Sequence, residues 1–372
     1  MKKVLFVATV VKTHIMEFHI PYLKMFKELG WETAVAAKND YENLEDCKIP
    51  YCDKYYNVPF ERFPLKPQNI AAYKMLKKII DDGDYEIVHC HTPVGAMLTR
   101  LAAIGARRGG TRVYYTAHGF HFYTGAPLIN WVLYYPVEKW LARYTDVLIT
   151  INKEDYERAK KFKAKKVFYV PGVGIDINRF GMECGTNIKF EIRKELGIPL
   201  DATVLLSVGE LNKNKNHKVI IQALGQMQNN NLYYVICGRG PMMDEYQALA
   251  KKLGISKRII LTGYRTDVCK FYQMADIFVF PSYREGLPIS MIEAMYNGLP
   301  IICTNIRGSR DLIEDSQNIL VDNPEDQSVF IQGILKLNDQ STREKIGSFN
   351  RKKANNYLLP VVTEQYKKIY KL

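Results

Sequence analysis

Two carboxylates flank a sharp turn at the start of a predicted helix. Glu285 and Glu293 belong to the segment REGLPISMIEAMYNGLPII (residues 284–302), which follows the apolar, strand-like run ADIFVFPSY. The first backbone N–H groups of a helix are unpaired and point outward, so they attract anions. The two glutamates therefore either cap this helix or flank a place where another anion binds.

A basic loop and two glycine turns are further candidates for anion binding. In the run NKNKNH (residues 212–217), Lys213 or Lys215 could reach a phosphate, although a solvated loop has the same pattern. GRGP (residues 238–241) and VPGVG (residues 170–174) are glycine turns, and such turns usually do no more than reverse the chain. The chain has neither G-x-G-x-x-G nor G-x-x-x-x-G-K-[ST], which argues against dinucleotide-dependent and P-loop enzymes.

Histidines lie near two other strand ends. His89 and His91 share one face of the run HCH, and His118 follows the strand-like run RVYYTA. The pair hints at a metal site, but apart from Cys90, which points to the opposite face, no carboxylate or cysteine partner stands at ligand spacing, so packing or polar lining is favoured. His118 is either a structural histidine or a group that hydrogen-bonds or exchanges a proton with a substrate. A G-x-S-x-G elbow is missing, which argues against a serine hydrolase.

The composition is that of a globular protein with a basic surface. Of the 372 residues 47% are apolar and 24% charged, which excludes a fibrous or disordered chain. The N-terminal run MKKVLFVATVVKTH imitates a signal peptide, but it lacks a cleavage site and is interpreted as a buried strand of the mature protein. Seven cysteines without a C-x-x-C pair indicate reduced thiols in a cytosolic chain. The net charge of +13 suits an anionic membrane surface or phosphorylated ligands, and no nucleic-acid-binding signature accompanies it.

Short apolar strands and amphipathic helices alternate along the chain, with one break at about residues 170–189. This alternation predicts two doubly wound α/β domains, each with a parallel sheet covered on both faces. Ligands of such sheets bind at the carboxyl ends of the strands, so we expect a cleft lined by those ends. The last residues predict a helix that Pro360 kinks and that packs back on the first domain. The candidate segments all follow predicted strands: VVKTH, HTP, AHGFH, GELNKNKNH, GRGP, GYRTD and SYREGLP.

These segments together resemble glycosyltransferase family 4, and the resemblance covers nearly the whole chain. The run EGLPISMIE is similar to the E-x₇-E motif of the family, and LLSVGELNKNKNH, CGRGP, DYEIVHCHTP and YTAHGF are similar to its other landmarks. Within the family the chain is most similar to bacterial capsule and exopolysaccharide transferases. The resemblance implies the GT-B architecture of two Rossmann-like domains facing a central cleft. It implies an acceptor domain at residues 1–176, completed by a C-terminal helix from about residue 358, and a donor domain at residues 177–357.

The resemblance also implies a nucleotide-sugar site around the E-x₇-E motif. Glu293 matches the carboxylate that binds the ribose hydroxyls, and Glu285 matches the one that contacts the transferred sugar. The backbone N–H groups of Gly286 and Leu287 would face the diphosphate. Lys215 matches the lysine that neutralises the leaving diphosphate as its charge grows.

Further residues enter by the same resemblance. His118 matches a histidine beside the reacting centre, so the implied catalytic residues are His118, Glu285 and Lys215. The other implied donor contacts are Arg239, Gly240, Tyr264, Arg265 and Thr13, and the implied acceptor-side residues are His14, His91 and His121.

The chain departs from the family pattern in two places. Glu210 stands where the family usually has an arginine that contacts the diphosphate, and a like charge there is unfavourable unless the side chain points away. The first-domain glycine loop of the family is replaced by VVKTHIMEFH, which includes Thr13 and His14. Both departures fall on the implied donor site.

The resemblance implies a retaining glycosyltransferase that needs no metal and no cofactor. Its donor would be a UDP-sugar carrying N-acetylhexosamine, galactose or glucose. Its acceptor would be a lipid-linked saccharide at the inner, cytoplasmic face of the cell membrane, where the protein would bind peripherally. Two alternatives remain: a non-catalytic nucleotide-sugar-binding subunit of a glycan assembly complex, and a GT-B sugar-nucleotide epimerase.

Overall fold

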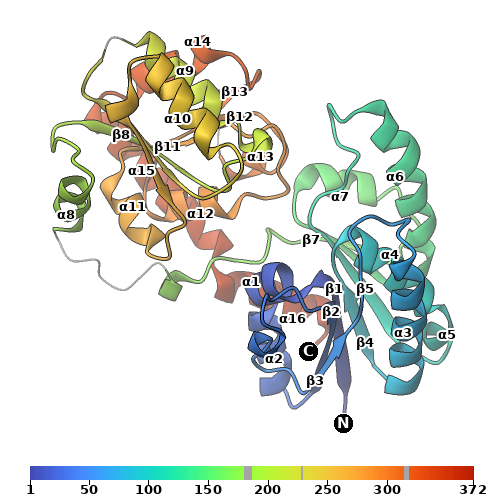
Figure 1. Cartoon of the computed structure of the whole chain (residues 1–372). Coiled ribbons are helices and arrows are strands. Elements are labelled where there is room, and N and C mark those ends of the chain that lie inside the picture. Colours follow the sequence, from blue (N-terminus) through green and yellow to red (C-terminus); the bar gives the residue numbers. More distant parts are fainter. Residues whose placement is uncertain (180–186, 228, 314–317) are drawn as a thin grey trace. The chain divides into compact units, whose positions relative to one another are not determined.

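The computed structural model describes residues 1–179, 187–227, 229–313 and 318–372, which form two compact units (Figure 1). Unit 1 comprises Met1–Val173 and Thr363–Leu372, and unit 2 comprises Gly174–Val362. From the sequence we expected the first domain to end at residue 176 and the second to end at about residue 357. The six described cysteines carry free thiols, and Cys184 lies outside the described residues.

Unit 1 is built on a parallel seven-stranded sheet with the order β3-β2-β1-β4-β5-β6-β7. Because side chains alternate between the faces of a strand, Leu5 and Val7 of β1 join one core cluster while Phe6 faces the opposite side. The strands are β1 (Lys3–Val10), β2 (Glu32–Lys38), β3 (Lys54–Asn57), β4 (Ile87–Cys90), β5 (Arg112–Ala117), β6 (Val147–Thr150) and β7 (Lys166–Tyr169).

Helices cover both faces of this sheet, as Figure 1 shows. Leu76 of α3 and Leu98 of α4 pack in the core cluster that contains Leu5. On the other face, Phe26 of α2 contacts Tyr370 of α16, with ring centres 4.9 Å apart. The helical segments are η1 (Val11–Ile15, a π-helix), α1 (Met16–Phe18), α2 (Ile20–Glu28), η2 (Leu44–Asp46), α3 (Gln68–Gly83), α4 (Pro93–Ala102), α5 (Ile104–Arg108), α6 (Leu128–Leu141), η3 (Ala142–Tyr144), α7 (Lys153–Ala159) and the greater part of α16 (Leu359–Tyr370).

Unit 2 repeats the architecture on a parallel six-stranded sheet with the order β10-β9-β8-β11-β12-β13. Its strands are β8 (Thr203–Val208), β9 (Leu232–Cys237), β10 (Ile259–Gly263), β11 (Ile277–Phe280), β12 (Ile301–Thr304) and β13 (Ile319–Val321). Its helical segments are η4 (Ile177–Arg179), α8 (Ile188–Glu195), η5 (Lys213–Lys215), α9 (His217–Gln226), α10 (Met243–Lys252), η6 (Ser256–Arg258), α11 (Val268–Met274), α12 (Ile289–Tyr296), α13 (Ser309–Leu312), α14 (Gln327–Lys336), α15 (Gln340–Ala354) and η7 (Asn355–Tyr357). The two doubly wound α/β domains predicted from the sequence are confirmed.

The C-terminal helix returns to unit 1 as expected, but the predicted kink at Pro360 is wrong. Helix α15 ends at Ala354, the short segment η7 follows it to Tyr357, and a new helix, α16, begins at Leu359. Pro360 is therefore the second residue of a helix, where a missing N–H breaks no intrahelical hydrogen bond. Across the described residues, no helix is both long and apolar enough to span a bilayer.

The side chain of Asp146, which precedes β6, connects helix α5, strand β5 and the residue before β7 in unit 1. Its carboxylate accepts two hydrogen bonds from Arg107, each 2.9 Å long, and one of 2.8 Å from the backbone N–H of Val113, and Lys165 Nζ lies 2.7 Å away. Burial alone would raise the pKa of Asp146, but the contacts with Arg107, Lys165 and Val113 outweigh it and lower this pKa to about 2. Because a lowered carboxyl pKa favours the folded state above the unfolded pKa, this stability is lost as the pH falls from about 4 to about 2.

We predict that Asp146→Asn lowers the free energy of unfolding of unit 1 by about 2–4 kcal/mol at pH 7, because the nearly buried Arg107 loses its partner. All three tryptophans (Trp31, Trp131 and Trp140) lie in unit 1, so a urea titration followed by their fluorescence reports on this unit. The matched control is Asp81→Asn, which breaks an exposed ion pair with Lys77 and should change the free energy by less than about 0.5 kcal/mol. Equal effects of the two substitutions would contradict the assignment.

Candidate active site

Unit 2 gathers predicted site residues where its strand order reverses. β8 lies between β9 and β11, and the carboxyl ends of strands at such a reversal are where open α/β sheets bind ligands. Lys215 follows β8 and Glu285 follows β11. Lys215 Nζ lies 2.8 Å from Glu285 Oε1, and both side chains are mostly buried, at 18% and 16% exposure. The structure therefore brings together two of the three predicted catalytic residues.

Two asparagines hold the loop that carries Lys215. The side chain of Asn212 accepts a 3.0 Å hydrogen bond from the backbone N–H of Lys215, and Asn214 donates one of 2.9 Å to the carbonyl of Arg284. The Lys215 ammonium also lies 4.7 Å from the ring centre of Phe280, within the range of a cation–π contact. Lys215 is consequently held in place before any ligand binds.

The GRGP turn brings its backbone against the same loop. A Cβ on Gly238 would lie 1.8 Å from the carbonyl oxygen of Gly209, and a Cβ on Gly240 would lie 2.4 Å from that of Leu211. No side chain fits at either position, so glycine is required by packing alone. The predicted role of Gly240 in donor binding stays a prediction.

The start of α12 is held by contacts with the loop after β12. Within the described part of the chain, no side chain caps this helix, whose N-cap is Pro288. The preceding turn is supported by Arg307, which donates a 3.1 Å hydrogen bond to the carbonyl of Glu285. Gly308, with a φ of +79°, packs so closely that a Cβ would lie 2.1 Å from the carbonyl oxygen of Gly286. The turn is thus held by Arg307 and Gly308, and no described side chain caps the first N–H groups of the helix.

Glu293, on the same helix, is oriented by a tyrosine that the sequence analysis missed. The hydroxyl of Tyr272 donates a 2.7 Å hydrogen bond to Glu293 Oε2 and lies 3.2 Å from the carbonyl of Ser290. Burial, followed by the neighbouring carboxylate, raises the pKa of Tyr272 well above its usual value, so the hydroxyl keeps its proton and donates. Tyr272 is on α11, and only the three-dimensional packing of α11 beside α12 identifies it.

The remaining predicted donor residues of unit 2 lie on exposed loops. Arg239 and Tyr264 are exposed, whereas the guanidinium of Arg265 makes a two-pronged contact of 2.8 and 2.9 Å with Asp267. Arg265 therefore holds its own loop, and its predicted contact with a base stays a prediction. The exposed side chain of Glu210 accepts a 2.9 Å hydrogen bond from Asn212.

Unit 1 has a matching reversal at β1, which lies between β2 and β4, and histidines gather there. His91 and His118 follow β4 and β5, and Nδ1 of His91 lies 3.3 Å from Nε2 of His118. His14, on the π-helix η1, and His19, which precedes α2, complete the group. Burial lowers the pKa of each of these imidazoles, that of His118 to about 4, so all four are neutral at pH 7. Among them the sequence analysis missed His19, which no motif distinguishes.

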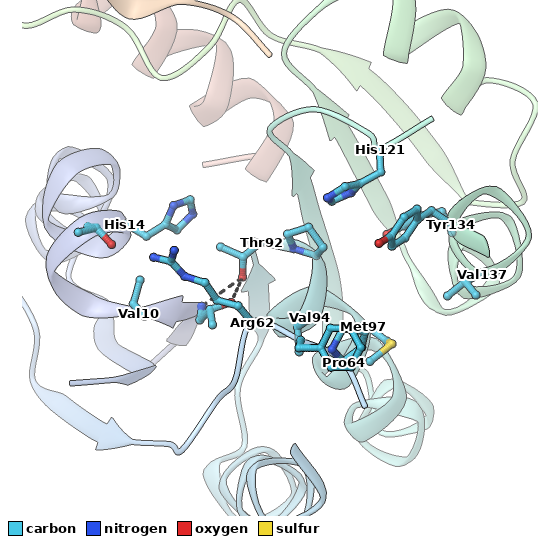
Figure 2. A pocket seen from close by; sticks show the side chains of 15 residues that line it. Val10, His14, Arg62, Pro64, Thr92, Val94, Met97, His121, Tyr134 and Val137 are labelled. Atoms are coloured by element: carbon cyan, nitrogen blue, oxygen red, sulfur yellow. Dashed lines mark hydrogen bonds between the residues drawn. The ribbon is translucent and has the colours of Figure 1, made fainter. Parts of the chain in front are cut away.

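A pocket of about 410 Å³ lies beside this cluster, within unit 1 (Figure 2). His14, Arg62 and His121 are among its polar lining residues, and the ring of His121 stacks on that of Tyr134 with 4.6 Å between centres. Thr13 also lines it, whereas His91 and His118 do not. The further lining residues are Thr9, Val10, Phe63, Pro64, Thr92, Pro93, Val94, Met97, Val137 and Glu138. A mainly apolar wall with few polar groups is typical of a ligand pocket.

Thr92, in this pocket, has an unusual backbone conformation. Its φ is +62°, which is rare for a β-branched residue and is typical of strained functional loops. Its hydroxyl accepts a 3.1 Å hydrogen bond from the backbone N–H of Thr9, shown in Figure 2, and donates one of 2.5 Å to the carbonyl of His91. These contacts fix the chain immediately after His91.

Two family models match the chain. The model described as Glycosyltransferase Family 4 matches residues 22–179, and the one described as Glycosyl transferases group 1 matches residues 188–353. Each match falls almost wholly within one unit.

Curated relatives match over most of their length. The EpsD protein of Bacillus subtilis (strain 168), whose name marks its glycosyltransferase activity as provisional, is 42% identical over 99% of this chain and 96% of its own. The UDP-Gal:alpha-D-GlcNAc-diphosphoundecaprenol alpha-1,3-galactosyltransferase of Escherichia coli is 31% identical over 73% of this chain and 70% of its own. The N-acetylgalactosamine-N,N'-diacetylbacillosaminyl-diphospho-undecaprenol 4-alpha-N-acetylgalactosaminyltransferase of Campylobacter jejuni is 33% identical over 91% and 87%.

Solved structures share the fold of the whole chain. Anabaena Alr3699/HepE, in complex with UDP and glucose, superposes with a TM-score of 0.80 at 17% identity and covers 100% of both chains. WaaG, a glycosyltransferase involved in lipopolysaccharide biosynthesis, has a TM-score of 0.76 at 19% identity over 98% of this chain and 99% of its own. The GT-B fold expected from the sequence is confirmed.

We predict that Gly308→Ala loosens the turn before α12, because the new methyl group would overlap the carbonyl of Gly286. Hydrogen–deuterium exchange should then rise in peptides that cover residues 285–292. Gly254→Ala is the matched control: it has a similar φ of +70° but nothing within 4 Å, so it keeps only the backbone strain of about 1–2 kcal/mol. Unchanged exchange in Gly308→Ala would show that Gly308 does not support the turn.

Proposed function

The chain is a member of glycosyltransferase family 4 that acts in glycan synthesis, and we propose that it transfers a sugar from a UDP-sugar to a lipid-linked saccharide. The sugar would be N-acetylhexosamine, galactose or glucose, and the product an exopolysaccharide, capsule or other cell-surface glycan. The names of the E. coli and C. jejuni relatives support this class, because both acceptors are saccharides on diphosphoundecaprenol. UDP bound to Alr3699/HepE supports the donor.

The observation that carries this proposal is the Lys215–Glu285 pair in the turn region before α12, a helix that no described side chain caps. A diphosphate at the helix start would receive hydrogen bonds from the backbone and take over the ammonium of Lys215, which stabilises the charge of the leaving group. Glu285 would then be released to accept hydrogen bonds from the sugar. Glu293, held by Tyr272, would accept hydrogen bonds from the two ribose hydroxyls.

We propose transfer with retention of the anomeric configuration. The bond between the anomeric carbon and the donor phosphate oxygen breaks, and a bond from the acceptor hydroxyl oxygen to the same face of that carbon forms. The departing phosphate oxygen takes the proton of the acceptor hydroxyl, so no side chain needs to form a covalent intermediate. Lys215 and the N–H groups of α12 supply the positive charge that this step needs, and we therefore propose that transfer requires no metal and no cofactor.

The pocket of unit 1 is the proposed place for the acceptor. Arg62 offers a cation for a phosphate group, and His14 and His121 offer hydrogen bonds to hydroxyl groups. Val94 and Met97 form part of an apolar wall that suits the first carbons of a lipid. One pocket thus presents groups for each chemical part of a lipid-linked saccharide.

Helix α6 is the proposed membrane contact. It exposes an unusual number of large apolar side chains, among them Leu128, Ile129, Val132, Leu133, Val137 and Trp140. Lys139 and Arg143 lie in the same region, and the whole chain carries a net charge of +13. Apolar side chains flanked by cations suit the interface of an anionic membrane, and we propose that the protein binds the inner, cytoplasmic face peripherally.

A non-catalytic nucleotide-sugar-binding subunit is the second candidate, and Glu210 is the feature that favours it. This carboxylate stands where an arginine is expected, but its exposed side chain is hydrogen-bonded to Asn212. A sugar-nucleotide epimerase of the same fold is a third candidate. Turnover and product mass distinguish the three.

We predict that Lys215→Met lowers kcat by about 10²–10³-fold, because the leaving diphosphate loses its cation. The assay measures UDP release from a panel of UDP-sugars with a lipid-diphosphate-linked saccharide, and mass spectrometry should show an acceptor that is heavier by one sugar. Lys218→Met is the control: Lys218 is exposed, pairs with Glu245 at 3.7 Å and should leave kcat unchanged within about twofold. Undiminished turnover in Lys215→Met would remove Lys215 from the mechanism. An altered sugar of unchanged mass would indicate an epimerase, and no turnover with any donor and lipid acceptor would favour a binding subunit.

We predict that the double variant Val132→Asp, Leu133→Asp loses most of its binding to phosphatidylglycerol-containing vesicles, because two charges on α6 would have to enter the interface. Flotation of the purified full chain with the vesicles measures this. Leu335→Asp removes a leucine of similar exposure (58%, against 54% for Leu133) from unit 2 and should float like the wild type. Equal flotation of all three proteins would show that α6 is not the contact.

A further inference from the structure

The histidine cluster of unit 1 has hydrogen-bonding capacity that the protein does not use. Both ring nitrogens of His19, together with Nε2 of His14 and Nε2 of His91, are buried without a partner in the described part of the structure. A neutral imidazole carries one N–H donor and one acceptor nitrogen, and a buried polar atom without a partner costs about 1–3 kcal/mol. Several such atoms in one place call for a physical explanation.

The neighbouring His89 has hydrogen-bond partners for both ring nitrogens, unlike the cluster of His14, His19, His91 and His118. The ring nitrogens of His89 are hydrogen-bonded to the hydroxyls of Tyr370 (2.5 Å) and Thr116 (2.8 Å). His89 is therefore a satisfied structural histidine, as favoured from the sequence. Among the described residues of the cluster itself, His91 and His118 form a hydrogen bond of 3.3 Å between their rings.

The positions of the other four rings fit ligands around one ion. One nitrogen from each of His14, His19, His91 and His118 lies within 4.8 Å of the corresponding nitrogen of every other ring. With Zn–N bonds of about 2.0–2.1 Å, two nitrogens of a tetrahedral site lie about 3.3–3.4 Å apart. The observed 3.3 Å between Nδ1 of His91 and Nε2 of His118 matches this spacing, so His91 would bind the ion through Nδ1 and not through its unpartnered Nε2.

The distances between the ring centres are a second test of whether the four histidines could bind one ion. The centres of imidazoles bound to one tetrahedral zinc ion lie about 5 Å apart. The centres of His14 and His19 are 5.0 Å apart, those of His14 and His118 are 5.1 Å apart, and those of His91 and His118 are 5.5 Å apart. Two pairs are wider, at 5.9 Å for His14 and His91 and 6.0 Å for His19 and His118. His19 and His91 are closer, at 3.8 Å, so we expect these two rings to separate when an ion binds.

We propose that His14, His19, His91 and His118 bind one divalent transition-metal ion of the zinc class. Four neutral imidazoles favour zinc, cobalt, nickel or copper over magnesium and calcium, which prefer oxygen ligands. His14 borders the pocket of unit 1, so the charge of the ion would face a space open to solvent and anions. The ion would join η1, the segment before α2 and the loops after β4 and β5.

This inference does not depend on the proposed function. The residues that would hold the ion all belong to unit 1, whereas Lys215 and Glu285 belong to unit 2, and the ion has no role in the proposed departure of the diphosphate. The expectation that transfer needs no metal therefore remains a separate prediction. An apo-protein titration without any sugar nucleotide tests the metal site alone.

We expect the full chain, purified without a histidine tag and treated with chelator, to bind one equivalent of Co²⁺ with the intense visible absorption of a tetrahedral complex. Zn²⁺ should displace the Co²⁺, and Mg²⁺ should not. The double variant His14→Gln, His118→Gln should bind at least about 100-fold more weakly, since two of four ligands are lost. His121→Gln is the matched control: it also removes one of the seven histidines, from the nearby pocket, and should bind Co²⁺ like the wild type.

Tryptophan fluorescence of unit 1 verifies that each variant is folded, and if the double variant is not, the single variant His14→Gln replaces it, because His14 is only half-buried. No saturable binding to the wild-type chain would overturn the proposal. Wild-type affinity in the folded histidine variant would overturn it as well, because the ion would then be held elsewhere.

Discussion

The reversal of strand order in each sheet is the constraint on which the rest of the structure depends. The chain builds outward from β1 to β3 and from β8 to β10, and then returns to build on the other side with β4 and β11. At each reversal the two neighbouring loops leave the sheet in opposite directions, so no crossover covers the carboxyl ends of these strands. Lys215 and Glu285 lie at one reversal and the histidine cluster at the other.

The residues at the two strand-order reversals differ in charge. In unit 2 a lysine and a glutamate neutralise each other at 2.8 Å, so the diphosphate of the proposed donor would exchange one partner of Lys215 for another instead of meeting an isolated buried cation. In unit 1 burial holds the clustered imidazoles neutral, which leaves their nitrogen lone pairs available. The same kind of sheet edge thus presents a cation in one unit and electron-pair donors in the other.

Close approach of the backbone connects the fold of unit 2 to its site. Gly238 and Gly240 let the turn after β9 press against the loop after β8, and Gly308 supports the turn before α12. These contacts make the site a property of four neighbouring strand ends, those of β9, β8, β11 and β12, and of no single motif. They also explain why the glycines of GRGP need no nucleotide to account for them.

The sequence by itself determined the fold class, the two units and most of the strands, because alternating apolar strands and amphipathic helices report directly on burial. It missed β3 and β7, at the two edges of the first sheet, and β13, at one edge of the second. These strands are only partly buried, so they lack the continuous apolar run that marks the equally short interior strands β4, β6, β11 and β12. The expected kink at Pro360 was wrong because a proline shows that a helix is interrupted nearby, but not whether the proline lies inside a bent helix or in the first turn of a new one.

The motif around Glu285 and Glu293 could likewise be found from the sequence, because its residues follow one another along a single turn and helix. Only the tertiary structure decided which distant residues complete the site. Tyr272 reaches Glu293 from another helix, Asn214 fixes the loop before Glu285 from a different strand end, and His19 joins histidines up to 99 positions away. Their positions depend on how parallel strands are ordered in the sheet, and that order is set by long-range packing, which leaves no local signal in the chain.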